Sequence, residues 1–188
     1  MNSVSNIVTQ AAANSTARRI GLVCAGVMVM AIAAQIAIPI PGTPIPVTLQ
    51  VPAVLIIGGL LGPRLGAASL VAYLAVGAVG LPVYQPLGVP GFARLIGPTG
   101  GYLLSFPLAA ALVGILSLRR SIPLLVLGLV GGLVVVHAGG VAQLMILGGD
   151  ASTAFRWGSM PFLIGDALKL LFAGLAVWRL SPSVRALL

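Results

Sequence analysis

The sequence has very little charge. Only two acidic residues, Asp150 and Asp166, occur among 188, and 6% of all residues are charged. A soluble domain carries about 25% charged residues, so this chain cannot cover a water-facing surface. Its long apolar runs are continuous rather than alternating, which disfavours membrane strands. Together with the short Pro, Gly and Arg connectors, they predict an all-α membrane protein that crosses the bilayer several times.

Other residue types are equally scarce, and each scarcity excludes a class of function. The single cysteine, Cys24, cannot form an internal disulfide, and no cluster has metal-ligand spacing, so neither a metal nor a cofactor is expected. The chain lacks a phosphate-binding loop and any nucleophile–base arrangement, so we expect neither an enzyme nor an ATPase. Its basic residues lie singly or in pairs beside apolar runs, which indicates a lipid bilayer rather than nucleic acid as the partner.

The apolar runs predict six membrane-spanning helices. The run from Val47 to Val83 is too long for one span of about 20 residues, and Gly62-Pro63-Arg64 interrupts it, so a tight hairpin is expected there. Proline-rich loops at 39–46 and 81–98 are apolar enough to form structured caps. The predicted organisation is a polar N-terminal tail, 1–17, followed by one membrane domain, 18–188, with spans at 20–38, 48–61, 65–81, 97–118, 122–147 and 160–180.

The arginines predict the orientation of the bundle. With six spans, both termini lie on one side, together with the turns at Arg64 and at Arg119-Arg120. That side collects most of the arginines, whereas the other holds only Arg94 and Arg156. The positive-inside rule therefore places both termini in the cytoplasm. The expected location is the bacterial inner membrane, and homo-oligomerisation is left open.

Asp166 and Lys169 are the candidate functional pair. Lys169 is the only lysine, and the spacing i, i+3 places both side chains on one face of the last span. Ionisable groups within hydrocarbon are costly and mark binding sites or ion pathways. A structural ion pair is the alternative, and a proton relay lacks further carboxylates. A polar, mostly neutral solute fits better, because Asp166 accepts N–H groups and Lys169 donates. His137 is predicted to be a hydrogen-bonded interior histidine.

Five stretches, taken in order, resemble the BioY family, the biotin-specific substrate-capture (S) components of energy-coupling factor (ECF) transporters. They are PIPVTLQ at 44–50, LLGPRLG at 60–66, GAVGLPV at 77–83, GPTGGY at 97–102 and GDALK at 165–169. The resemblance covers residues 18 to 180. It implies a six-helix bundle with an outward-facing pocket closed by the first extracellular loop.

The resemblance also implies the roles of individual residues. Asp166 and Lys169 would contact the bicyclic head of biotin, the capping loops and aromatic residues would form the walls, and Arg94 is the candidate for the carboxylate. The predicted substrate-binding residues are Asp166, Lys169, Thr48, Gln50, Tyr84, Phe92, Arg94, Gly101 and Tyr102.

Family resemblance further implies protein partners. A small-xxx-small motif on the first helix docks the transmembrane coupling (T) subunit, and Gly21-xxx-Ala25 matches it in position. ABC-type ATPase subunits would supply the energy for biotin uptake. Two alternatives remain, namely an S component for a different vitamin and a stand-alone proton-coupled carrier of a small solute.

Overall fold

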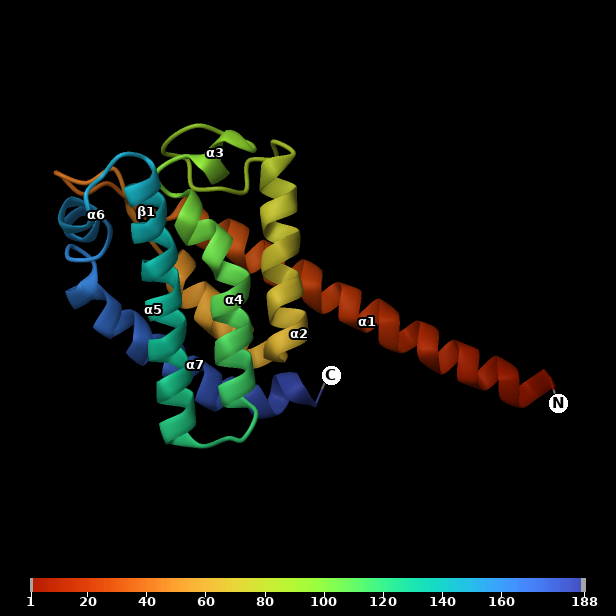
Figure 1. Cartoon of the computed structure of the whole chain (residues 1–188). Coiled ribbons are helices and arrows are strands. Elements are labelled where there is room, and N and C mark those ends of the chain that lie inside the picture. The colour runs from red at the N-terminus through yellow and green to blue at the C-terminus, as the bar shows by residue number, and fades with distance from the viewer. Residues whose placement is uncertain (1, 187–188) are drawn as a thin grey trace.

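The structure is a computed structural model that describes residues 2–186, with side chains described from Ser15 onward. Helices account for most of it, and one short β-hairpin and several loops make up the rest (Figure 1). The elements are α1 (Asn2–Gln35), β1 (Ala37–Ile38), β2 (Val47–Thr48), α2 (Gln50–Ala78), α3 (Ala93–Ile96), α4 (Gly100–Ser117), α5 (Ile122–Ile146), α6 (Ala151–Gly158) and α7 (Leu163–Arg185).

Several of these helices have the length and composition of membrane spans. Within the described residues, four helices qualify, in α1, α2, α4 and α5. The pair α6 and α7, which is bent by 52°, adds a fifth if it counts as one span. The chain is therefore an all-helical, multi-pass membrane protein.

Helix α2 consists of two helices joined at a sharp turn. Gly62 has φ 77° and ψ 179°, a backbone conformation open only to glycine. The side-chain amide of Gln50 donates to the Tyr73 hydroxyl over 2.9 Å. In a straight helix these residues would lie about 35 Å apart. The two halves therefore fold back on each other, and the predicted hairpin at Gly62-Pro63-Arg64 is confirmed.

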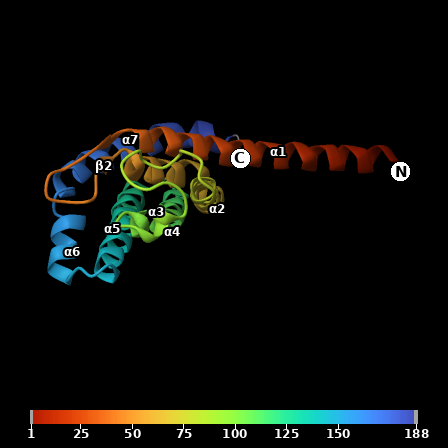
Figure 2. The same cartoon turned by 90° about the horizontal axis from the view of Figure 1, so that it is seen from above.

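Helix α1 begins earlier and ends earlier than the predicted span at 20–38. Residues 2–17, which were predicted to form a tail, continue the same helix, and its N-terminal part projects away from the bundle in both views (Figures 1 and 2). It ends at Gln35 because Ala37 and Ile38 pair with Thr48 and Val47 in an antiparallel hairpin. The proline-rich segment 39–46 forms the tip of that hairpin.

The segment 148–159, which joins the predicted spans at 122–147 and 160–180, contains helix α6. Asp150 caps its start, since the carboxylate accepts the Thr153 backbone N–H over 3.0 Å and the Thr153 hydroxyl over 2.6 Å. These hydrogen bonds hold the pKa of the Asp150 carboxyl below its usual value. α6 turns the chain back toward the bundle before α7 begins.

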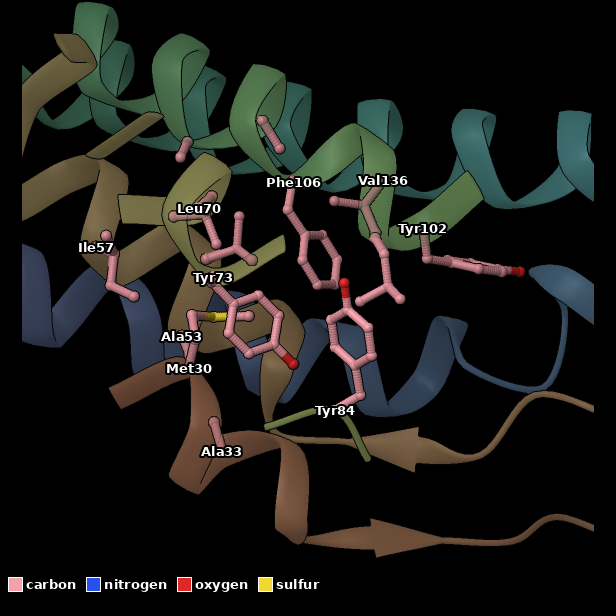
Figure 3. Packing of buried hydrophobic residues seen from close by; sticks show 14 of the residues in the cluster. Met30, Ala33, Ala53, Ile57, Leu70, Tyr73, Tyr84, Tyr102, Phe106 and Val136 are labelled. Carbon is pink, nitrogen blue, oxygen red and sulfur yellow. The ribbon is translucent and has the colours of Figure 1, made fainter. Parts of the chain in front are cut away.

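The buried core lies where α1, both halves of α2 and α4 meet. Tyr73 and Tyr84 pack edge to face with ring centroids 5.5 Å apart, and Phe106 completes the aromatic cluster (Figure 3). Small residues allow the close approach of the backbones, since Gly58 of α2 lies directly against the backbone of Ala110 in α4. This core fixes the ends of α2 and α4 that border a cavity beneath the β1–β2 hairpin.

Candidate functional site

A cavity of about 60 Å³ lies beneath the β1–β2 hairpin, between α2, α4, α5 and α7. Most of its wall is apolar or aromatic, and its ionisable side chains gather near the start of α7. The lining residues are Ile45, Pro46, Val47, Thr48, Gln50, Val51, Tyr84, Gln85, Thr99, Tyr102, Leu103, Phe106, Val136, His137, Phe162, Asp166 and Lys169.

Asp166 is the central polar group of the cavity. It is 2% exposed, and its two carboxylate oxygens have different partners. Lys169 Nζ donates to Oδ1 over 2.9 Å, while His137 Nε2 lies 2.8 Å from Oδ2. On the other side of the imidazole, Nδ1 lies 3.0 Å from Ser159 Oγ and 3.2 Å from the carbonyl oxygen of Gly158. A buried charge needs such partners, because an unpaired one would be strongly destabilising.

The hydrogen-bonding groups of Asp166 and Lys169 that are not used within the protein define what the site can bind. A carboxylate offers about four lone-pair sites, and an ammonium group has three donors. Asp166 and Lys169 use only part of that capacity on each other, and both line the cavity. These two residues, which form the floor of the cavity, can therefore accept hydrogen bonds from N–H groups of a ligand and donate one to its carbonyl at the same time. The apolar walls favour a ligand with a compact, largely uncharged head.

Thr48 and Gln50 line the cavity and belong to one hydrogen-bond network. The Thr48 hydroxyl donates to Gln50 Oε1 over 3.2 Å, and the amide of Gln50 donates to Tyr73. The Tyr73 hydroxyl in turn donates to the carbonyl of Val83 over 3.0 Å. This network fixes the rotamer of Gln50 and ties β2 to the loop after α2.

Tyr84 and Tyr102 also line the cavity, but their hydroxyls are bound elsewhere. Tyr84 donates to the carbonyl of Leu74 over 2.7 Å, and Tyr102 donates to that of Gly158 over 2.6 Å. Burial raises the pKa of Tyr84, which lies in the loop between α2 and α3. Both rings consequently present rigid apolar surfaces to the cavity.

Three predicted residues lie away from the cavity. Phe92 is 63% exposed. Arg94 is buried in its own loop, where the guanidinium donates to the carbonyls of Leu87 and Gln85, and burial lowers its pKa. Gly101 packs against the backbone of Gly139 in α5, where a larger residue would not fit.

Several residues that were not among the predicted binding residues also line the cavity. His137 is hydrogen-bonded as predicted, yet it also faces the cavity beside Asp166. The rings of Phe106 and Phe162 contribute to the wall. His137 could have been proposed because it is the only histidine in the chain, but apolar periodicity does not distinguish a cavity phenylalanine from a core one.

The predicted partner residues lie on an uncovered face of α1. Gly21 and Ala25 are exposed, and no described atom lies within 4 Å of a Cβ built on Gly21. Met28 and Ile32 continue the same helical face and are 62% and 68% exposed. Among the described residues, nothing covers this face.

A buried carboxylate–lysine pair that opens onto a cavity in a multi-pass helical bundle defines a membrane protein that binds a small solute. The BioY family model matches residues 6–186. The chain therefore belongs to the BioY family, which is a family of transporters rather than enzymes.

Curated relatives and a solved structure support this assignment over most of the chain. A protein of Pyrococcus horikoshii named as a probable biotin transporter BioY is 35% identical, covering 87% of this chain and 96% of its own length. The biotin transporter BioY of Thermotoga maritima is 36% identical, covering 85% and 94%. The crystal structure of an S-component for biotin from an ECF-type ABC transporter matches with a TM-score of 0.70 at 28% identity, covering 96% and 94%.

Proposed function

We propose that this chain captures biotin from outside the cell and delivers it to the cytoplasm. The observation that carries the proposal is the Asp166–Lys169 pair on the cavity floor, 2.9 Å apart and flanked by aromatic walls. The names of the relatives point to the same substrate.

Biotin matches the chemistry of this cavity. Its ureido ring has two N–H donors and one carbonyl, which suit the carboxylate of Asp166 and the ammonium group of Lys169. Thr48 and Gln50 supply further polar contacts from β2 and the start of α2. The rings of Tyr84 and Tyr102 contact the apolar part of the bicyclic head.

The cavity must widen to hold biotin, and the β1–β2 hairpin is the part proposed to move. A cavity of about 60 Å³ is smaller than the roughly 300 Å³ at which small-molecule sites begin. The tip of the β1–β2 hairpin is attached to α6 by the Thr43 hydroxyl, which donates to the carbonyl of Trp157 over 2.8 Å. Breaking this hydrogen bond would let the hairpin move away from α6 and admit the ligand.

The bundle has six spans in this proposal, with both termini in the cytoplasm of a bacterial inner membrane. The two halves of α2, on either side of Gly62, count as separate spans beside α1, α4, α5 and α7. Arg64, Arg119 and Arg120 then lie in the cytoplasm, which accords with the positive-inside rule. The cavity opens outward, beneath the two proline-rich loops.

Partner subunits supply the energy for uptake. The exposed face that contains Gly21 and Ala25 suits a transmembrane T subunit, because small residues let helices approach closely in lipid. ABC-type ATPase subunits then drive the transport cycle. The solved relative comes from an ECF-type ABC transporter, which supports this arrangement.

A competition experiment on the purified chain tests the proposal. Biotin should bind, and desthiobiotin should displace it because it keeps the ureido ring, whereas thiamine and riboflavin should not. Binding of thiamine or riboflavin in place of biotin would overturn the substrate assignment.

A further inference from the structure

A second hollow, called the α5–α7 groove below, lies between the first part of α5 and the middle of α7, toward the turn at Arg119-Arg120. Its volume is about 330 Å³, within the range of small-molecule sites. The wall is apolar, with Leu125, Leu129 and Val130 on α5 facing Leu170, Gly174 and Trp178 on α7. Biotin capture, as proposed above, makes no use of this groove.

The groove results from the way the two helices cross. In Figures 1 and 2, α7 runs across α5 rather than along it. They are in close contact at Gly174, where an added Cβ would lie 3.2 Å from Leu129 Cδ1. The side chains around that contact do not fill the space between the two helices, so the groove is open toward the apolar surroundings of the bundle.

The positively charged side chain of Arg120 lies at one end of the groove. The guanidinium carbon of Arg120 lies 5.4 Å from the centroid of the Trp178 ring, within the range of a cation–π contact. Arg120 has φ 44°, a conformation uncommon for a residue other than glycine, and its side chain is exposed. Neither carboxylate of the described chain is near, since Asp150 caps α6 and Asp166 is bound to His137 and Lys169.

The dimensions of the groove match one leaflet of a bilayer. From Ile122 to Val130 the helix rises about 12 Å, and half of a hydrocarbon core of about 30 Å is about 15 Å. Apolar walls of this length that end at an unpaired guanidinium are complementary to an acyl chain that ends in a phosphate. A second copy of this chain would instead bring no free side-chain carboxylate to Arg120, because Asp150 and Asp166 are both engaged elsewhere.

We propose that the α5–α7 groove binds a phospholipid with an anionic headgroup. One acyl chain lies along Leu125, Leu129 and Gly174, and the phosphate and the charged headgroup contact Arg120 where it stacks on Trp178. The site is separate from the substrate cavity and does not depend on the identity of the solute.

Trp178 provides the probe for this site. The chain has two tryptophans, so a Trp157→Phe variant leaves Trp178 as the only one. The full chain is placed in nanodiscs of phosphatidylcholine that contain small fractions of acyl-brominated phosphatidylglycerol or acyl-brominated phosphatidylcholine. Brominated phosphatidylglycerol should quench Trp178 at an about fivefold lower mole fraction, the preference that one cation gives near an anionic headgroup.

Two substitutions and one control decide the outcome. Arg120→Ala should make the two brominated lipids equally effective, and Leu171→Phe should reduce quenching by both because it fills the exposed rim of the groove. Arg64→Ala removes the same charge at the α2 turn, away from the groove, and should keep the preference. Equal quenching in the parent protein, or equal loss with Arg64→Ala and Arg120→Ala, would overturn the proposal. A third result would also overturn it. If neither lipid quenched Trp178 in the parent protein and Leu171→Phe changed the oligomeric state, the groove would be occupied by a second copy of the chain.

Discussion

At the scale of single residues, the cavity depends on one carboxylate held from two sides. Asp166 interacts with Lys169 on its own helix and with His137 on α5. The pair within α7 would form in an isolated helix, whereas the contact with His137 requires α5 and α7 to be packed. The position of the carboxylate therefore depends both on the local helix and on the packing of α5 against α7.

Asp166→Asn should weaken biotin binding about tenfold to a hundredfold, as measured by calorimetry on the purified chain. A hydrogen bond to a charged group contributes about 1.5–3 kcal/mol, and each 1.4 kcal/mol is tenfold in affinity. Asp150→Asn is the matched control, because it neutralises the only other acid and asparagine still caps α6. An unchanged affinity in a folded Asp166→Asn variant would exclude the carboxylate as a ligand contact.

His137→Ala should also weaken binding, and its effect should not add to that of Asp166→Asn. If the imidazole acts by orienting the carboxylate, its removal has little further effect once the charge is gone. A double-mutant cycle should give a coupling of about 1 kcal/mol between the two sites. Additive effects on the affinity would mean that His137 contacts the ligand independently.

At the scale of elements, the turn within α2 depends on the backbone of Gly62. Gly62→Ala should lower the thermal unfolding temperature in detergent, because a side chain at φ 77° costs about 1–3 kcal/mol. Gly21→Ala is the control, since it lies in a helix with open space around it. A Gly62→Ala variant as stable as the parent would show that the hairpin tolerates another turn conformation.

The contact between the β1–β2 tip and α6 predicts an effect on binding rates. Thr43→Val keeps the shape of the side chain but removes its hydrogen bonds to the Trp157 carbonyl and the Ile45 backbone N–H. Both the association and the dissociation of biotin should accelerate, which stopped-flow tryptophan fluorescence would detect. Unchanged rates would mean that the hairpin opens without releasing this contact.

These elements also show how far the sequence alone could lead. The hairpin at Gly62 was predictable, because the apolar run is too long for one span and glycine and proline interrupt it. Helix α6 was not predicted, since eight residues give no long apolar signal, although Asp150 and Thr153 carry a capping pattern. Asp166 and Lys169 were identified because charge is so rare here. The contact between His137 and Asp166 was not predictable, because it depends on how α5 and α7 pack. The position of Arg94 was not predictable either, because its guanidinium donates to carbonyls of its own loop.

At the scale of the whole molecule, the substrate cavity and the exposed face of α1 are separate surfaces. Gly21→Leu should impair biotin uptake by cells that contain the partner subunits, because the added bulk prevents close helix packing. Biotin binding to the purified variant should be unchanged. Ala142→Leu adds comparable bulk at an exposed position on α5 and should leave uptake unchanged. Equal loss of uptake and binding in Gly21→Leu would indicate a folding defect instead.

The pairing of Asp166 with Lys169 also has an electrical consequence. Since the two charges cancel, the carboxylate of bound biotin leaves the loaded site with one net negative charge from these three groups. Carrying that charge inward against an inside-negative membrane potential requires about 2.3 kcal/mol per 100 mV. Delivery would then be electrogenic, and part of the work done by the ATPase subunits would be done against the membrane voltage.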